Sequence, residues 1–598
     1  MTMHPIDIAI LIGYLLLVVI SGAMLAKRAA QNLDSYFLAG NKLPWYLLSV
    51  SNASGMFDIT GTMWMVTLLF VYGMKSVWIP WLWPSFNVIF MMVYLAAWLR
   101  RSGVLTGGEW IRTRFGTGRG AELSQVSVVI FALTSVVGFL AYAFQGIGKF
   151  CQVFLPWDFT AAQYAMIFMT ITTIYVILGG MYSVVVTDLV QFTILTIASV
   201  AIAVIAVMKT TREQIVAAVP EGWHGLFFGW NLDLDWSALI PEINNKIEAD
   251  GYTMFGAFFM MMLFKGVLSS MAGPAPNYDM QRVLATRNPR EAALMSGFVS
   301  VVLYFPRYLL LAGIGCLALV FFSPDLVAMG ADADFEQILP YVINNFVPAG
   351  LVGLLLAGLL AAFMSTFDST VNAGAAYLVN DVIKRYFAPE MSDKSAIRAS
   401  YVCSILVVAV GIAFGSASDS IHDVLGWIVA GLFGGYIAPN LLKWHWWRLN
   451  GYGYFAGMLS GVGTALALPQ LFPDWHDLFS AFPVILVISS IASVAVSLMT
   501  PPDDEETLKE FYRNVRPWGF WQPVDAKVRV ESPDFQANTA FRRDMANILV
   551  GLVWHTTLAA LPIALVMREP RTALISAVLL VVTSVVLKKN WYDRLEAA

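Results

Sequence analysis

Long apolar segments separated by short polar loops repeat along almost the whole chain. A helix that crosses a bilayer needs about 20 predominantly apolar residues. About fifteen segments approach or exceed this length, at roughly 6–26, 45–71, 77–99, 121–147, 160–179, 184–208, 253–276, 294–322, 348–380, 397–415, 421–445, 452–470, 479–499, 545–567 and 571–590. The pattern predicts an all-α polytopic membrane protein with about fifteen transmembrane helices.

The composition supports this prediction and excludes other classes. Of the 598 residues, 58% are hydrophobic and 13% are charged, which excludes an ordinary soluble domain. The net charge of −4 and the lack of a basic tract give no indication of nucleic-acid binding. The sequence has neither the GxxxxGKS/T motif of a primary pump nor the HExxH motif of a metalloprotease. We expect a single membrane transporter domain over residues 1–598, not an enzyme, and no obligate protein partner is evident.

Basic residues are concentrated in alternate loops and indicate the orientation. They are Arg100, Arg101, Arg112, Arg114, Arg119, Arg282, Arg287, Arg290, Lys384, Arg385, Lys394, Arg398, Lys443 and Arg448. By the positive-inside rule these loops are cytoplasmic, so the N-terminus is expected outside and the C-terminus in the cytoplasm. Of the two long polar segments, residues 209–250 should lie outside and residues 500–543 inside.

The first apolar segment, residues 6–26, follows no basic residue and precedes Lys27 and Arg28. This arrangement is the reverse of a signal peptide, so we expect a retained helix. The only N-x-S/T sequence, Asn52-Ala53-Ser54, lies inside an apolar segment. The lack of an exposed glycosylation site fits an integral protein of a bacterial inner membrane.

The segment 348–381 is unusual because its centre is polar. On an α-helix, Ser365 lies beside Ser369, and Thr366 is also a neighbour of Ser369. An ionisable residue such as Asp368 costs at least about 2.5–3.5 kcal/mol in a membrane unless it faces protein, water or an ion. Oxygen ligands suit a hard cation, so the segment predicts a cation site. Alternatively, the hydroxyls bond back to helix carbonyls and Asp368 lies at a helix end.

Two other segments carry residues that interrupt a helix. The second has Ser54, Gly55 and Asp58 near its centre, and the seventh has Gly273, Pro274 and Pro276. Proline removes a helix hydrogen bond, and freed backbone groups inside a membrane need partners. The two segments are five apart, as expected for the first helices of two five-helix repeats. Such paired breaks indicate the midplane binding site of a transporter, with two kinked packing helices as the alternative.

Five stretches match a known family in order. They are DSYFLAGNKLPWY (34–46), GGEWIRTRFG (107–116), GGMYSVVVTDLVQF (179–192), QRVLA (281–285) and the 348–381 segment. On these residues the chain resembles the sodium:solute symporter family, which includes the sodium–glucose and sodium–proline transporters. The resemblance implies Na⁺ as the transported coupling ion and a LeuT-like inverted five-plus-five helix repeat over 33–450. Its breaks would lie near 54–61 and 273–276, with extra flanking helices at 6–26 and over 451–598.

The resemblance also implies ion sites. The typical sodium site would be formed by the carbonyls of Ser54, Phe57 and Ala362 and the side-chain oxygens of Ser365 and Thr366. Asp188 matches the aspartate of the family's TD pair, which in some members joins serines of the eighth core helix in a second sodium site. Here its partners would be Ser365, Asp368 and Ser369, with Asp368 in place of a serine.

The candidate solute contacts are Asp58, Thr60, Lys265 and Ser269. Asp58 resembles an aspartate of the proline transporters that lies close to the ion. The polar sugar contacts of the sodium–glucose transporters are largely absent, because Gly61, Pro80 and Ala272 occupy those positions.

Five ionisable residues lie well inside apolar segments: Asp58, Asp188, Lys265, Arg307 and Asp368. Their charges leave one net negative charge, which one sodium ion would balance. Asp188 is alternatively a structural partner of Arg307. Lys265 either extends its ammonium group to the membrane surface or holds a solute carboxylate.

Together these features predict a sodium-coupled symporter that imports a small organic solute, and we favour a sugar acid or another carboxylate. The alternatives are a sodium symporter for a neutral sugar or an amino acid, and a proton-coupled carrier that uses Asp58 and Asp368. A membrane sensor that binds a solute without transporting it is the alternative from another class.

Overall fold

The computed structural model describes residues 3–57, 59–82, 85–274, 278–330, 333–417, 434–472 and 478–596. Within these ranges the regular elements are helices, accompanied by one isolated β-bridge between Trp446 and Phe520. The all-α prediction is therefore confirmed for the described part of the chain.

The first half of the chain forms α1 (Pro5–Ala29), α2 (Leu33–Leu38), η1 (Ala39–Asn41), α3 (Trp45–Met56), α4 (Ile59–Tyr72), η2 (Gly73–Val77), η3 (Ile79–Leu82), α5 (Asn87–Phe90), η4 (Met91–Leu95), α6 (Ala96–Arg100), α7 (Gly107–Phe115), α8 (Arg119–Phe154), α9 (Ala161–Lys209), α10 (Arg212–Ala217), α11 (Glu242–Ala249), α12 (Phe255–Ala272) and α13 (Tyr278–Leu284). The second half forms α14 (Pro289–Phe321), α15 (Ser323–Met329), η6 (Phe335–Gln337), α16 (Ile338–Phe346), α17 (Leu351–Ala376), η7 (Tyr377–Phe387), α18 (Asp393–Ser416), α20 (Gly434–His445), α21 (Gly451–Leu471), α22 (Leu478–Met499), α23 (Glu505–Val515), α24 (Gln522–Glu531), α25 (Phe541–Val566), α26 (Pro570–Asn590) and η9 (Tyr592–Arg594).

Ten of the described helices are long and apolar enough to cross a membrane. α3 and the stretch Gly61–Val77, bent by 69° relative to each other, would together add an eleventh span. α9 alone covers two of the predicted segments, 160–179 and 184–208. The predicted segment 421–445 lies largely outside the described residues. The total of about fifteen spans therefore stays a prediction.

α9 bends at Gly180, where φ is 49° and ψ is −147°. A Cβ atom at this position would lie 2.6 Å from the carbonyl oxygen of Tyr36. Both the positive φ and the close approach require glycine. The bend gives the two halves of α9 different directions, and the second half carries Asp188.

Both predicted breaks fall between described helices. α3 ends at Met56 and α4 begins at Ile59, while α12 ends at Ala272 and α13 begins at Tyr278. α17 packs against α1, α3, α8 and α9, and most of its residues from Val352 onward are buried. The polar positions of α17 therefore lie in the interior, beside the break after α3.

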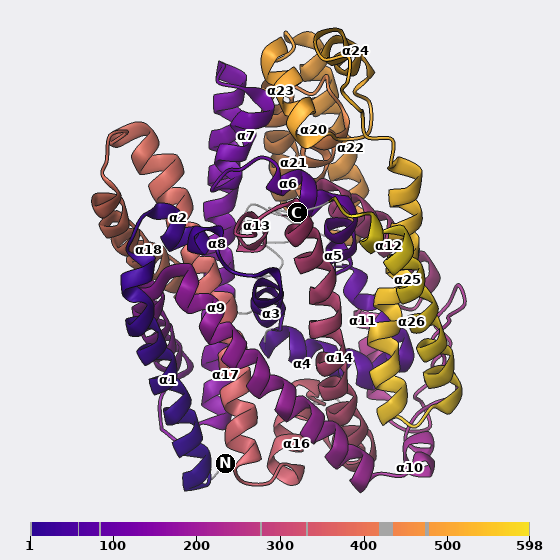
Figure 1. Cartoon of the computed structure of the whole chain (residues 1–598). Coiled ribbons are helices and arrows are strands. Elements are labelled where there is room, and N and C mark those ends of the chain that lie inside the picture. The colour runs from indigo at the N-terminus through magenta and orange to yellow at the C-terminus, as the bar shows by residue number, and fades with distance from the viewer. Residues whose placement is uncertain are drawn as a thin grey trace.

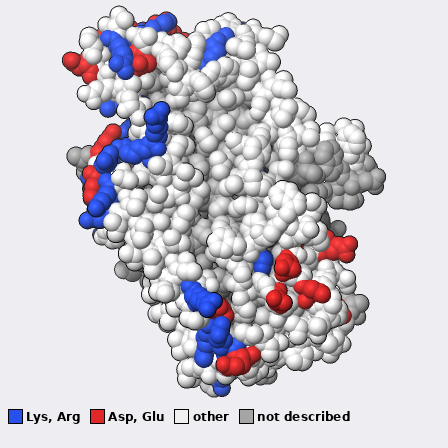
Figure 2. All heavy atoms as spheres, turned by 90° about the vertical axis from the view of Figure 1, so that its right-hand side faces the viewer, with Lys and Arg blue, Asp and Glu red and all other residues white. Residues whose placement is uncertain are grey.

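The helices form a tall bundle, with α10 near one end and α23 and α24 at the other (Figure 1). α25 and α26 lie along one side, and α1 lies along the opposite side. On the face shown in Figure 2, most of the surface carries no charged side chain, and charged residues gather in groups towards the two ends. An uncharged band of this kind suits contact with lipid tails.

Candidate ion and solute site

A buried polar cluster lies where α3, α9, α13 and α17 meet. Arg282 of α13 donates from Nη2 to Asp188 Oδ2 of α9 at 3.3 Å and to Ser369 Oγ of α17 at 2.6 Å. Its Nε donates to Ser51 Oγ of α3 at 3.1 Å, and the Ser51 hydroxyl donates to Asp188. All four side chains are buried. Arg282 therefore links three other helices through one guanidinium group.

This contact corrects two expectations from the sequence. Arg282, counted above among the loop arginines, has a side chain that is only 1% exposed. Arg282 lies within α13 (Tyr278–Leu284) and not in the loop that follows it. Arg307, considered as the partner of Asp188, donates instead to the Met56 carbonyl at 3.1 Å. The buried ion pair of Asp188 is with Arg282.

Asp368 lies inside α17 and not at a helix end, so that alternative is wrong. Its Oδ2 accepts a hydrogen bond from the Tyr175 hydroxyl at 2.7 Å, and its Oδ1 accepts one from Ser369 at 3.1 Å. The carboxylates of Asp368 and Asp188 are close enough to repel each other. Within this cluster two carboxyl groups share one guanidinium group, so the cluster carries one net negative charge when both carboxyl groups are ionised. A bound cation would neutralise it.

The hydroxyl groups of α17 are only partly occupied by helix carbonyls. Ser369 donates to the Ser365 carbonyl at 2.8 Å, and Thr366 donates to that of Ala362 at 3.2 Å. Thr366 also reaches across to the Gly55 carbonyl of α3 at 2.8 Å. The back-bonding alternative therefore describes some hydroxyls but does not account for the contact between α17 and α3.

In the part of the chain that the structure describes, two buried oxygen atoms of the cluster have no hydrogen-bond partner apart from the interaction between their own two side chains. They are Ser365 Oγ and Asp188 Oδ1, which belong to neighbouring side chains. Buried polar atoms normally have a partner, so these two oxygens fit ligands of an ion. Near them, Phe57 donates its N–H to the Ser54 carbonyl at 3.1 Å at the end of α3. The hydrogen bond from Thr366 to the Gly55 carbonyl brings α17 into contact with this end of α3.

The predicted solute residues are less closely grouped. Asp58 and the side chain of Thr60 lie outside the described residues. Ser269 and Lys265 are both 8% exposed on α12. The Lys265 ammonium lies 6.0 Å from the ring centroid of Phe482, on α22. Arg307 lies beside the break after α3, because its guanidinium carbon is 5.5 Å from the ring centroid of Phe57.

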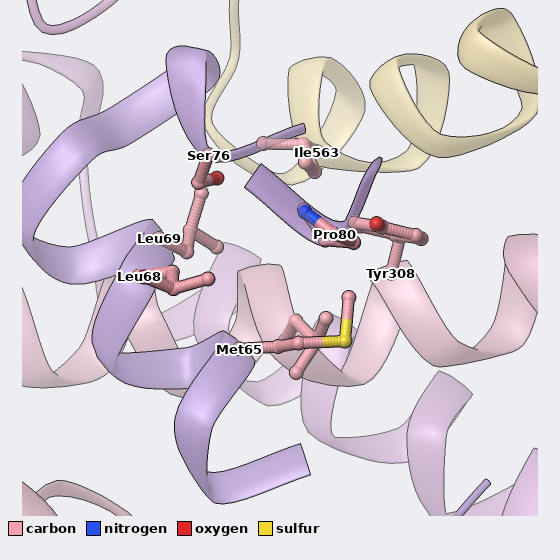
Figure 3. A pocket seen from close by; sticks show the side chains of 8 residues that line it. Met65, Leu68, Leu69, Ser76, Pro80, Tyr308 and Ile563 are labelled. Atoms are coloured by element: carbon pink, nitrogen blue, oxygen red, sulfur yellow. The ribbon is translucent and has the colours of Figure 1, made fainter. Parts of the chain in front are cut away.

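A narrow gap, with no room for a water molecule, lies between α4, η2, η3, α14 and α25. Its eight lining residues are Met65, Leu68, Leu69, Ser76, Pro80, Tyr308, Leu311 and Ile563 (Figure 3). Apart from the Ser76 and Tyr308 hydroxyls, this lining is apolar. It contains none of the predicted ion or solute residues, and a charged solute would find no counter-charge there.

Broken membrane helices around a buried charged cluster define an ion-coupled membrane transporter. The sodium:solute symporter family matches residues 36–461, and the chain belongs to this family. It is accordingly a sodium-coupled symporter and not an enzyme, with Na⁺ as the coupling ion.

Several curated relatives resemble almost the whole chain. Sodium/glucose cotransporter 4 of Danio rerio is 26% identical, over 89% of this chain and 84% of the relative. A sodium/mannose cotransporter of Bos taurus is 24% identical, over 83% of this chain and 87% of the relative. The sodium/myo-inositol cotransporter of Homo sapiens is 24% identical, over 84% of this chain and 74% of the relative.

The fold is also similar to a solved structure, described as the substrate-bound outward-open state of a Na⁺-coupled sialic acid symporter. The TM-score is 0.65, with 17% identity over 84% of this chain and 99% of that one. This similarity confirms the LeuT-like fold class predicted from the sequence.

Proposed function

We propose that the chain imports a small organic solute together with sodium bound between α3 and α17. The ligands are the carbonyls of Ser54, Phe57 and Ala362 and the hydroxyls of Ser365 and Thr366. The observation that carries this proposal is the Thr366 hydroxyl, which already joins α17 to the Gly55 carbonyl at the end of α3. A sodium ion at this junction would hold the two helices together, and its release would let them separate.

A second sodium site is proposed around Asp188 and Asp368. Two buried carboxyl groups beside a single guanidinium group support it, as do Ser365 Oγ and Asp188 Oδ1, which have no partner among the described residues apart from the interaction between their own side chains. Ser369 is a weaker ligand than the sequence suggested, because its hydroxyl already contacts Arg282, Asp368 and the Ser365 carbonyl. Ser365 is therefore the hydroxyl through which the two sites would communicate.

For the solute, we favour a carboxylate such as a sugar acid. Arg307 supports this preference, because its guanidinium group lies beside the break after α3. Lys265 offers weaker support, because its ammonium group lies over Phe482 on α22. A carboxylate would gain a charge-assisted hydrogen bond that a neutral sugar lacks. The relatives named for glucose, mannose and myo-inositol favour a neutral polyol as the alternative.

The proposed setting is a bacterial inner membrane, with the N-terminus and residues 209–250 outside and residues 500–543 in the cytoplasm. The loop arginines support this orientation. This orientation is tested by placing a cysteine in each polar segment and labelling it from the outer or the inner side of membrane vesicles.

The sodium site is tested by binding of radiolabelled sodium to the purified full-length protein, which does not require a known solute. The double variant Ser365→Ala/Thr366→Ala should lose most of the binding, because it removes two ligands without adding bulk. Ser199→Ala is the matched control, since this buried hydroxyl donates to the Leu195 carbonyl of its own helix. Unchanged sodium binding in the folded double variant contradicts the assignment.

Asp368→Asn separates the second site from the first. If Asp368 binds a second ion, this variant should lower the Hill coefficient for sodium or weaken apparent affinity. If Asp188 has only a structural role, Asp188→Asn should lower protein yield while leaving sodium cooperativity intact. Arg282→Gln should then partly restore the yield, because it removes the charge left without a partner.

Solute charge is tested by comparing uptake of glucuronate and glucose into proteoliposomes with an inward sodium gradient. Arg307→Met should abolish a preference for the acid if Arg307 binds the carboxylate, and Lys265→Met should do so if Lys265 binds it. Equal or better uptake of glucose by the wild type would favour the neutral polyol.

A further inference from the structure

α1 precedes the part of the chain that the family matches, which begins at residue 36. One stripe of α1 is buried and consists of Asp7, Leu11, Tyr14, Val18 and Gly22. These positions follow one another at intervals of three or four, so they form a single face of the helix. On other faces, residues such as Leu16 and Met24 are 59% and 76% exposed, as expected of residues in contact with lipid. The buried stripe packs against α9 and α17.

Near its N-terminal end, α1 caps α17. Asp7 Oδ1 accepts hydrogen bonds from the backbone N–H groups of Gly350 and Gly353, both at 2.7 Å. The first four N–H groups of a helix have no partner within the helix, and α17 has no side-chain cap at Gly350. The buried carboxylate also interacts favourably with the positive end of the helix dipole. A Cβ atom on Gly353 would lie 2.5 Å from Asp7 Cα, so the two helices are in direct contact here.

Further along, α1 contacts the surroundings of the ion ligands. The Tyr14 hydroxyl accepts a hydrogen bond from Gln191 Nε2 of α9 at 2.7 Å and donates to Met364 Sδ of α17 at 3.6 Å. Met364 directly precedes Ser365 in the chain. Two turns later, a Cβ atom on Gly22 would lie 2.8 Å from Tyr175 Cβ. The hydroxyl of Tyr175 holds Asp368.

These contacts fix α17 at its start, next to Ser365 and, through Tyr175, at Asp368. We propose that α1 is a positioning helix for the sodium site, with Asp7 and Tyr14 holding α17 in the register that points Ser365 and Thr366 at α3. The inference rests on the proposed sodium site. Ligand groups need to be held within about 0.5 Å of their productive position, so a small axial shift of α17 weakens ion binding.

The test is sodium binding to purified full-length variants, measured as the concentration that gives half-saturation. Asp7→Ala should raise it by about threefold to tenfold, the range expected from loss of a helix cap. Asp7→Asn should have a smaller effect, because its amide oxygen still accepts a hydrogen bond without carrying the charge. Tyr14→Phe should raise half-saturation about threefold, and Gln191→Leu should add little to it, because the two side chains share one hydrogen bond.

Two α1 variants serve as controls. Leu11→Ala lies on the same buried stripe but removes only apolar contacts, so it should lower the unfolding temperature and leave half-saturation unchanged. Leu16→Ala should change neither. If Leu11→Ala shifts half-saturation as much as Tyr14→Phe, α1 acts through general packing and the proposal is wrong. It is also wrong if Asp7→Asn and Tyr14→Phe, which preserve the shape of the side chains, both bind sodium as the wild type does.

These experiments distinguish failure of the proposed role of α1 from failure of the proposed sodium site. If Ser365→Ala/Thr366→Ala loses sodium binding while the α1 variants keep it, only the role of α1 is excluded. If the double variant keeps sodium binding, the proposed site is wrong whatever the α1 variants show.

Discussion

α10 of the 209–250 segment and α23 and α24 of the 500–543 segment lie towards opposite ends of the bundle (Figure 1). In both segments tryptophan indoles donate hydrogen bonds to carbonyls of neighbouring helices. In the first, Trp223 and Trp236 donate their indole N–H groups to the carbonyls of Phe70 and Val71, at 3.0 and 3.2 Å. These carbonyls lie in the last turn of α4, where a helix has no backbone partners left. The 209–250 segment therefore holds the end of α4 that is distant from the break.

The 500–543 segment reaches a break itself. Trp521 donates to the Trp444 carbonyl at 2.9 Å, and Trp444 donates from its indole to the Ala272 carbonyl at 3.1 Å. Ala272 is the last residue of α12 before the second break. Two hydrogen bonds through Trp444 therefore connect the 500–543 segment to the last residue of α12.

The two segments also differ in what fixes them. The 209–250 segment is fixed by neutral hydrogen bonds, such as that of Met74 N–H to the Trp223 carbonyl, and by the Lys75 ammonium, which donates to the Gly222 carbonyl. Its ion pair of Arg212 with Glu569 is partly exposed. The 500–543 segment depends on fully buried Arg114, whose Nη1 lies 3.6 Å from Asp503 Oδ2. Neutral hydrogen bonds contribute little net free energy, whereas leaving one partner of a buried ion pair alone costs several kcal/mol. The first segment is therefore easier to release than the second.

The largest expected effect is that of Arg114→Ala. Arg114 donates to the carbonyls of Lys443, Trp446 and Leu449 at 3.0, 3.1 and 3.0 Å. Without the guanidinium group, these carbonyls and the Asp503 carboxylate lose their partner, so we expect a loss of about 3–5 kcal/mol in the free energy of unfolding. Thermal unfolding of the purified protein measures it.

Arg114→Lys is the matched control, because lysine keeps the charge but cannot reach several carbonyls from one planar group. It should be intermediate between wild type and Arg114→Ala. If Arg114→Ala unfolds at the wild-type temperature, the contrast between the two segments does not rest on this ion pair.

A smaller effect should come from replacing single tryptophans by phenylalanine, which removes the N–H group and keeps an aromatic ring. Trp223→Phe and Trp444→Phe each leave one carbonyl without its donor, at a cost of about 1–3 kcal/mol. Trp444→Phe should also weaken sodium binding, because Ala272 borders the break, whereas Trp223→Phe should not. Amide hydrogen exchange at the ends of α4 and α12, together with radiolabelled sodium binding, separates the two. Equal effects of the two variants on sodium binding would contradict the difference between the two segments.

The sequence predicts the elements whose pattern is local. The apolar segments, the polar stripe Ser365–Ser369 and the ranges of both breaks follow from spacing along single helices, and five short motifs indicate the family. Contacts between distant residues leave no such pattern. Asp7 caps a helix 343 positions further along the chain, and no periodicity reveals this.

Arg282 was misplaced for a related reason. Counting basic residues after an apolar segment assigns it to a loop, because Gly273, Pro274 and Pro276 seem to end the helix before it. The motif QRVLA contains it and carried the signal that was missed. A family motif that begins directly after a break belongs to the second half of the broken helix. The residues next to the break should therefore be considered core residues before they are counted as loop charges.

The smallest expected effect is a difference in how the two segments respond to pH. Burial raises the pKa of Asp503 to about 6 despite the attraction of Arg114. The folded protein therefore holds this proton more tightly than the unfolded chain, and stability is lost as the pH rises from about 4 through 6. Asp503→Asn removes this titration, so the unfolding temperature of the variant relative to wild type should rise as the pH increases from about 4 to 7.5.

Burial lowers the pKa of His224, although Glu569 at 3.3 Å opposes the shift. For His224, stability is lost as the pH falls below the ordinary value of about 6.5. His224→Gln should match wild type at pH 7.5 and exceed it near pH 5. Thermal unfolding at several pH values measures both differences; if both variants gain on the wild type in the same direction of pH, the opposite pKa shifts argued for the two segments are wrong.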